Sequence, residues 1–150
     1  MARRSHFVPL ILSSLIFSAC ATREARIADT RVAVKTVLIQ ENAAWADDVS
    51  SDEPPESGSD FILEEKDVRE FFKVARKATH TEYNHDLLMS RCYAGGLVIL
   101  QDGSEGFWRI DRARRGKIVF PDKSVLFFFC AECRSEAYGE ACDIDCIHAD

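Results

Sequence analysis

The sequence predicts an α+β domain in which one long amphipathic helix packs on a four- to five-stranded antiparallel β-meander. Four short apolar runs between residues 90 and 130 are separated by turn sequences such as Asp102-Gly103 and Pro121-Asp122-Lys123, a pattern typical of antiparallel hairpins. Before them, apolar residues recur at three- and four-residue spacing, which indicates a helix with one buried face. The length of 150 residues, with 47% hydrophobic and 29% charged residues, fits one globular domain.

The first 19 residues have the pattern of a signal peptide. Arg3 and Arg4 lie in a short basic region, and residues 7–17 are mostly apolar. This apolar stretch is too short to cross a bilayer, which takes about 20 residues. We therefore expect residues 1–19 to direct export and to stay outside the folded domain.

The residues at the end of this segment, Phe17-Ser18-Ala19-Cys20, resemble the lipobox of bacterial lipoproteins. The resemblance implies that the Cys20 thiol receives a diacylglycerol and that a further acyl chain is added to its amine after cleavage. It also implies an outer-membrane lipoprotein facing the periplasm, because Ala21 rather than an aspartate follows the cysteine. The alternative is a soluble periplasmic protein that begins at Thr22, since Ala19-Cys20-Ala21 also fits an ordinary cleavage site.

The charge balance narrows the choice of partners. The full chain carries a net charge of −6, and the part that follows residue 19 carries −8. A nucleic-acid-binding domain needs a basic surface, so we expect no nucleic-acid partner. Charge alone would not hold such a chain on anionic lipid either, so we expect the lipid anchor to make the membrane contact.

Residues 20–60 are predicted to form a flexible, lipid-anchored acidic tether. Within it, Arg31–Gln40 is a strand candidate that would either add an edge strand to the meander or remain part of the linker. Residues 47–60 hold six acidic residues, two prolines and four serines, and no basic residue. Such a composition buries too little apolar surface to offset the cost of ordering, which favours a disordered spacer over an acidic ligand for a basic partner.

The helix is expected to run from Phe61 to His80 or Asn84, with Ser59 or Asp60 capping its start. Its apolar stripe is formed by Val68, Phe71, Phe72, Ala75 and Ala78. Two histidines follow at positions 80 and 85, but a spacing of five places them on different faces, unlike a zinc-binding helix. We predict neither a metal site nor a cofactor there.

In the meander, alternate residues should face the helix. The residues expected on the helix side are Trp108, Ile110, Ile118, Phe120, Leu126 and Phe128, and those expected on the opposite side are Phe107, Val119, Val125, Phe127 and Phe129. The last strand is apolar on both faces, so either another segment covers its second face or that face is a partner site. Residues 31–40 or the C-terminal tail could supply the cover.

Basic residues cluster around the second turn of the meander, and we considered them, with two phenylalanines, as a partner surface. The candidate surface consists of Arg109, Arg112, Arg114, Arg115, Phe127 and Phe129, with Lys117 beside it. Such a surface could bind phosphates or an acidic partner. A solvated hairpin tip that prevents edge pairing would have the same sequence pattern.

Five cysteines follow Cys20, and export favours disulfides over a metal site for them. We expect one disulfide from Cys92 to Cys133, or to Cys130, because the first and last meander strands reach the same end of the sheet. Cys142 and Cys146 are candidates for further disulfide pairing. The Cys130-x-x-Cys133 pair closes a β-meander rather than opening a helix, which argues against a thiol redox enzyme.

The predicted domain therefore spans residues 61–135, followed by a cysteine-containing tail at 136–150. The succession of Cys-Tyr-Ala-Gly-Gly, Trp-Arg-Ile-Asp and Phe-Phe-Phe-Cys-Ala-Glu-Cys resembles small exported bacterial proteins that are uncharacterised, so the resemblance implies no activity. The sequence contains no evident nucleophile–base set, paired carboxylate or phosphate loop, and we expect a protein that is not an enzyme.

The leading functional hypothesis is a non-catalytic envelope lipoprotein that binds another macromolecule. Its narrowest form is an immunity or inhibitor protein against an envelope-acting toxin or hydrolase, because a small, acidic, exported domain suits that role. The alternative is a structural or assembly lipoprotein of the outer membrane. A thiol- or zinc-dependent enzyme is the third hypothesis.

Overall fold

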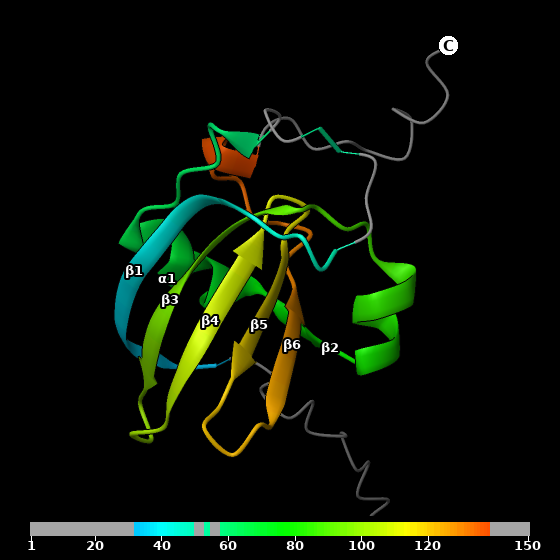
Figure 1. Ribbon diagram of the computed structural model, residues 1–150. Coiled ribbons are helices and arrows are strands. Elements are labelled where there is room, and N and C mark those ends of the chain that lie inside the picture. The colour runs from blue at the N-terminus through cyan, green and yellow to red at the C-terminus, as the bar shows by residue number, and fades with distance from the viewer. Residues whose placement is uncertain (1–31, 50–52, 55–57, 139–150) are drawn as a thin grey trace, which may run out of the picture.

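The computed structural model describes residues 32–49, 53–54 and 58–138. These residues form a six-stranded antiparallel sheet with one helix packed behind it (Figure 1). The strands, in the order β1-β3-β4-β5-β6-β2 across the sheet, are β1 (Val34–Trp45), β3 (Cys92–Leu100), β4 (Glu105–Asp111), β5 (Arg115–Val119), β6 (Val125–Phe129) and β2 (Arg76–Ala78).

The expected four-stranded meander is present as β3 to β6, and its two faces are those that the alternation predicts. Trp108, Ile110, Ile118 and Phe128 are buried, and Phe120 and Leu126 pack against the same core from partly buried positions. On the opposite side, Phe107 is 59% exposed. Each turn contains a residue at positive φ that suits a tight reversal: Gly103, Arg114 and Lys123.

The predicted combination of one long helix and four or five strands is wrong. The sheet has six strands, and α1 spans only Glu65–Val74, the one helix of seven or more residues in the described part of the chain. A capping box starts it: Glu64 accepts from the backbone of Asp67, and Asp67 accepts from the Glu64 backbone N–H at 2.8 Å. The caps expected at Ser59 or Asp60 therefore lie one turn too early.

Helix α1 ends earlier than expected because the residues that follow it form an edge strand of the sheet. Ala75 leaves helical geometry with φ −58° and ψ 138°, and Arg76–Ala78 then pair with Phe127–Phe129 of β6 as β2. An uncovered β6 would present the backbone of an aromatic strand to solvent, and such an edge invites association. A short π-helical turn, η2 (Glu82–Asp86), follows β2 in place of the expected helix end.

The segment considered as a strand or linker, residues 31–40, contributes to β1, which pairs with β3 and extends to Trp45. Its register shifts three times, between Val34 and Thr36, between Ile39 and Glu41, and between Glu41 and Ala44. The polar Asn42 does not end the strand, because its side-chain amide forms two hydrogen bonds with the backbone of Leu63. The Leu63 N–H donates to Asn42 Oδ1 at 3.0 Å, and Asn42 Nδ2 donates to the Leu63 carbonyl at 3.1 Å. The folded unit therefore begins before residue 61.

The core lies between the sheet and α1. Phe71 packs against Gly116, where an added Cβ would come within 2.5 Å of the Phe71 ring. Phe72 contacts Phe128 edge to face, with the ring centroids 5.4 Å apart. Phe61 contacts Tyr138, with the ring centroids 5.7 Å apart, and Tyr138 belongs to a short 3₁₀ turn, η3 (Glu136–Tyr138). Only glycine in β5 lets the helix approach this closely, so the sheet–helix spacing depends on it.

Candidate docking face and the pocket beside it

An apolar row crosses the outer face of the sheet, the face turned away from α1. Leu38, Leu97, Phe107, Val119 and Val125 form this row, each paired directly with the next across five neighbouring strands. Directly paired residues of antiparallel strands point to the same side, so the five side chains form one continuous band. We call this band the apolar row.

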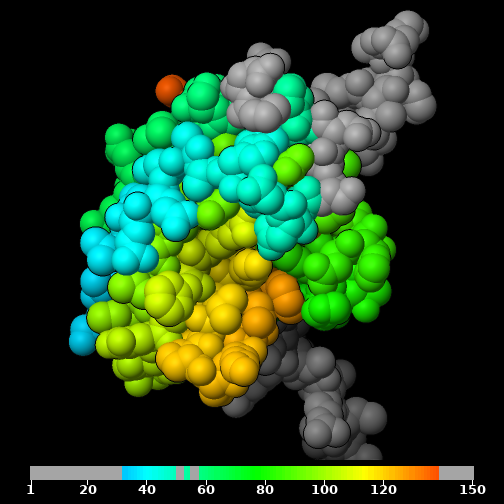
Figure 2. All heavy atoms as spheres, viewed as in Figure 1, coloured from blue at the N-terminus to red at the C-terminus, as the bar shows by residue number. Residues whose placement is uncertain are grey.

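The apolar row is accessible to solvent. Leu38 is 53% exposed and Phe107 59% exposed, and the other three side chains are partly buried by their neighbours. Figure 2 looks onto this face and shows β4 and β5 open between the segment after β1 and η2. Exposed apolar side chains that lie singly are common, but a continuous band of five is not.

Two basic residues lie next to the apolar row. Arg109 of β4 is paired directly with Lys117 of β5, so two positive charges stand side by side on the outer face. The Arg109 guanidinium stacks on the ring of Tyr93 at 3.7 Å, and it lies 3.8 Å from the carboxylate of Asp48. Burial and the neighbouring Arg109 lower the pKa of Lys117.

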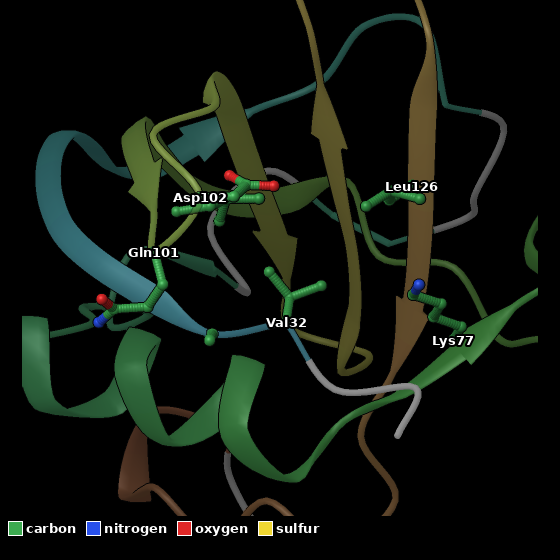
Figure 3. Close-up of a pocket in the computed structure, with 7 residues that line it drawn as sticks. Val32, Lys77, Gln101, Asp102 and Leu126 are labelled. Atoms are coloured by element: carbon green, nitrogen blue, oxygen red, sulfur yellow. The ribbon is translucent and has the colours of Figure 1, made fainter. Parts of the chain in front are cut away.

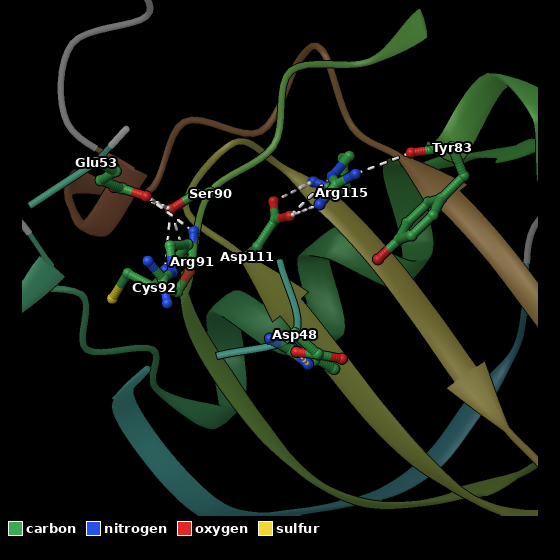
Figure 4. A network of polar contacts seen from close by, with 9 residues as sticks. Asp48, Glu53, Tyr83, Ser90, Arg91, Cys92, Asp111 and Arg115 are labelled. Atoms are coloured by element: carbon green, nitrogen blue, oxygen red, sulfur yellow. Dashed lines mark hydrogen bonds and ion pairs between the residues drawn. The ribbon is translucent and has the colours of Figure 1, made fainter. Parts of the chain in front are cut away.

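These basic residues open onto a cavity of about 160 Å³. A buried ion pair between Asp111 and Arg115 forms part of its wall (Figure 4). The Arg115 side chain donates to Asp111 Oδ2 at 2.8 Å from both Nε and Nη2, and its backbone N–H donates to Oδ1 at 3.0 Å. Its Nη1 donates to the carbonyl of Tyr83 at 2.8 Å, so η2 is held over this end of the sheet.

The environment of the ion pair is strongly desolvated. Burial raises the pKa of Asp111 to about 6, although Arg115 acts in the opposite direction. Burial also raises the pKa of Tyr83, which lies under Arg115, to about 12. Both oxygens of the Asp111 carboxylate already accept hydrogen bonds from Arg115.

The composition of segment 47–60 predicts a disordered spacer, but several of its described residues bond to residues of the domain. Glu53 accepts from the Ser90 hydroxyl at 2.8 Å and from the Arg91 N–H at 2.8 Å, and Asp60 pairs with Arg112 at 2.6 Å. The arginines of the domain thus neutralise carboxylates of this segment. Sequence composition could not show this, because the partners lie more than 35 residues away.

The candidate partner surface of the sequence analysis is not a single exposed patch. Arg112 pairs with Asp60, and Arg115 is buried. Arg114 lies over the ring of Tyr138 at 5.8 Å. The structure places the three remaining members separately. Arg109 stacks on Tyr93, and Arg76 lies over the ring of Phe129. The ring centroid of Phe127 lies 4.7 Å from that of Tyr83 and 5.6 Å from that of His80. Thus η2 and β2 cover Phe127 and Phe129, rather than residues 31–40, which pair with β3 at the other side of the sheet.

The cysteines also differ from expectation. Cys130 and Cys133 form a disulfide with each other, and Cys92 is a free, buried thiol that donates to the carbonyl of Gly58 at 2.9 Å. The predicted Cys92–Cys133 bond fails because β4 and β5 separate β3 from β6, and the turn after β6 brings Cys133 back to Cys130 at a Cα distance of 5.5 Å. Cys20, Cys142 and Cys146 lie outside the described residues.

A second cavity, of about 310 Å³, lies where the two outer strands approach each other (Figure 3). Val32 and Leu100 line it from the β1 side, and Lys77 and Leu126 from the β2 side. The sheet must therefore be strongly curved. No group of three or more histidine, cysteine or acidic residues within 32–49, 53–54 and 58–138 is arranged to hold a metal ion.

Sequence reasoning missed Leu38, Leu97, Asp48 and Asp111 as site residues. The apolar row could have been found by aligning the expected strands side by side, but this needs the register, which the sequence does not state. The helices in the described ranges are all too short or too polar to cross a membrane. Comparisons with protein-family models, curated proteins and solved structures give no match.

Proposed function

We propose that this chain is a non-catalytic lipoprotein of the cell envelope that binds another protein through the apolar row. The N-terminal resemblance to a lipobox supports the location, and the outer face of the sheet supports the mode of binding. In its narrowest form, the proposal is an immunity or inhibitor protein that docks on an envelope-acting toxin or hydrolase. The apolar row is the single observation that carries the binding function.

The shape of the row favours a protein partner over a small molecule. Five strands at about 4.8 Å spacing make the band roughly 19 Å wide. Small-molecule sites are concave and bury most of the ligand, whereas protein interfaces are wide and depend on a few central apolar or aromatic anchors. Phe107, exposed and central in the row, is the residue that best fits the role of an anchor.

The experiment compares three forms of the full-length protein, all expressed in the organism that the protein comes from. The cells are treated with a cross-linker, and each form is then purified from envelope extracts. Phe107→Ser removes the anchor, and Leu88→Ser is the matched control, because Leu88 is 71% exposed but lies after η2, outside the row. We expect the native protein and Leu88→Ser to retain the same cross-linked partner and Phe107→Ser to lose it. Equal retention by all three forms would refute binding through the row.

The identity of the retained protein then separates the hypotheses. A soluble toxin or hydrolase favours the inhibitor role, and components of outer-membrane assembly favour an assembly lipoprotein. Urea unfolding of the three forms checks that the loss is local. Phe107 is 59% exposed but is paired with Leu97 and Val119, so its substitution should cost about 1 kcal/mol, which leaves the protein folded.

A further inference from the structure

The pairing of Arg109 with Lys117 is unfavourable by itself. Like charges placed directly opposite each other on antiparallel strands destabilise a sheet, and partial burial strengthens the repulsion. Lys117 is partly buried, and no hydrogen bond or ion pair joins its side chain to another side chain among the residues that the structure describes. A negative charge placed between the two basic side chains would offset this repulsion.

Two carboxylates line the cavity, and Arg115 pairs with one of them, Asp111, which leaves Asp48 for the two basic side chains. Asp48 comes from the turn that follows β1, and its carboxylate lies 3.8 Å from Arg109, beyond hydrogen-bond distance. Its side chain is 75% exposed, so water competes for it. Asp48 also acts on Lys117, since its charge opposes the fall in the pKa of that lysine.

The guanidinium of Arg109, in contrast, is held in place by its contacts. Tyr93 stacks on the Arg109 guanidinium, and the Asp111–Arg115 pair fixes part of the wall of the cavity that Lys117 also lines. The cavity volume of about 160 Å³ suits one small acidic group rather than a whole ligand. A rigid, positively charged recess with a loosely held carboxylate at its mouth has the properties of a site that exchanges its occupant.

We propose that this recess is the seat for one carboxylate group of an acidic partner protein, and that Asp48 is the chain's own occupant of that seat. The inference rests on the proposed docking through the apolar row, because Arg109 and Lys117 adjoin Phe107 and Val119 on the same face. A partner would insert a carboxylate here while its apolar side chains cover the row. The net charge of −6 opposes an acidic partner only at long range, where salt screens it.

The test uses a synthetic peptide that copies residues 46–49, acetyl-Ala-Asp-Asp-Val-amide, as the probe. Its control peptide has asparagine in place of the second aspartate. Each is titrated into the full-length protein and into Asp48→Asn, and the backbone amide resonances of Arg109 and Lys117 are followed by NMR. We expect the acidic peptide to bind Asp48→Asn about tenfold more tightly than the control peptide does, because a charge-assisted contact is lost in the control.

The same peptide should bind the native protein more weakly than Asp48→Asn, because Asp48 competes for the seat. Lys117→Gln in the Asp48→Asn background should abolish the preference for the acidic peptide, whereas Lys123→Gln, on the exposed turn before β6, should not. Equal binding of the two peptides, or equal binding to native protein and Asp48→Asn, would overturn the inference. Neither result depends on Phe107, so the seat and the apolar row can fail independently.

Discussion

Asp111 and Arg115 form an ion pair across the turn between β4 and β5, and each residue is only 3% exposed. The pair holds the turn at Arg114, whose φ of 63° is unusual for a residue with a side chain. It also holds η2 on the sheet through the carbonyl of Tyr83. One buried arginine thus connects η2 to the hairpin of β4 and β5.

Arg115→Met should therefore destabilise the fold. The variant keeps most of the side-chain volume but leaves the Asp111 carboxylate buried without its cation, which costs about 3–5 kcal/mol in comparable cases. Urea unfolding at neutral pH measures the loss. Arg134→Met, at an exposed position, is the control and should change the stability by less than about 0.5 kcal/mol. A loss of similar size in both variants would contradict the role assigned to the pair.

The Asp111–Arg115 pair also predicts that the stability of the folded protein depends on pH. The pKa of Asp111 is raised to about 6 in the folded protein, from 3.8. The folded chain therefore binds this proton more tightly, and the contribution of Asp111 to stability is complete below about pH 3.8 and lost as the pH rises through about 6.

Without Arg115, the pKa of Asp111 should rise further, so that the penalty at high pH grows. We expect the stability difference between native protein and Arg115→Met to be largest near about pH 8 and to shrink toward about pH 4, as the carboxyl group becomes neutral. Unfolding curves at both pH values provide the measurement. A difference that stays constant, or increases in acid, would show that Asp111 does not govern the effect.

Cys92 should be unreactive while the protein is folded. Burial raises the pKa of its thiol from 9.0 to about 11, which lowers the thiolate fraction about 100-fold at neutral pH, and the side chain is inaccessible. Iodoacetamide should label the peptide that contains Cys92 only after denaturation in urea, as judged by mass spectrometry.

Gly58→Ala tests whether close packing of Gly58 on Cys92 keeps the thiol from reacting. A Cβ at position 58 would lie 2.2 Å from Cys92 Sγ, so the segment must move away. We expect the variant to lose roughly 1–3 kcal/mol of stability and to label faster at Cys92 under native conditions. Labelling of the native protein at the rate of the unfolded chain would contradict the buried position of the thiol.

The proposed anchor makes a prediction of a different kind. Cys20→Ala should release the protein from membranes into the soluble periplasm or leave it unprocessed, because two or three acyl chains give stable attachment where one does not. Cell fractionation and the mass of the mature N-terminus measure this. Unchanged membrane association with normal cleavage after Ala21 would exclude the lipoprotein.

The central meander could be predicted from sequence because its signals are local. Asp102-Gly103 and Pro121-Asp122 fix the turns, and the alternation of Trp108 and Ile110 with Phe107 and Arg109 fixes the faces. These signals need only neighbours within a few residues, and a strand period of two leaves little freedom.

The outer strands could not be predicted in the same way. No glycine or proline marks the end of α1 at Val74, and Arg76–Ala78 form a strand only because β6 lies beside them. Asn42 has the pattern of a turn residue, yet it continues β1 because Leu63 supplies partners for its amide. Such choices depend on tertiary contacts, which outweigh local preference.

The candidate site shares this dependence. The burial of Arg115 depends on the register of the strands. The aspartate beside Arg109 is Asp48, in a turn far earlier in the chain. The sequence showed a basic cluster, but not which charges it had already neutralised. The cysteine pairing failed for a related reason, since the turn after β6 returns at once to its own strand.

The uneven register of β1 bears on how the protein behaves when crowded. β1 is the long outer strand of the sheet, and its three register shifts, with Lys35 and Gln40 exposed, interrupt the straight ladder that a second chain would need for pairing. At the opposite border, β2 covers part of β6. The two borders of the sheet thus resist the strand-by-strand addition of further copies that would lead to polymerisation.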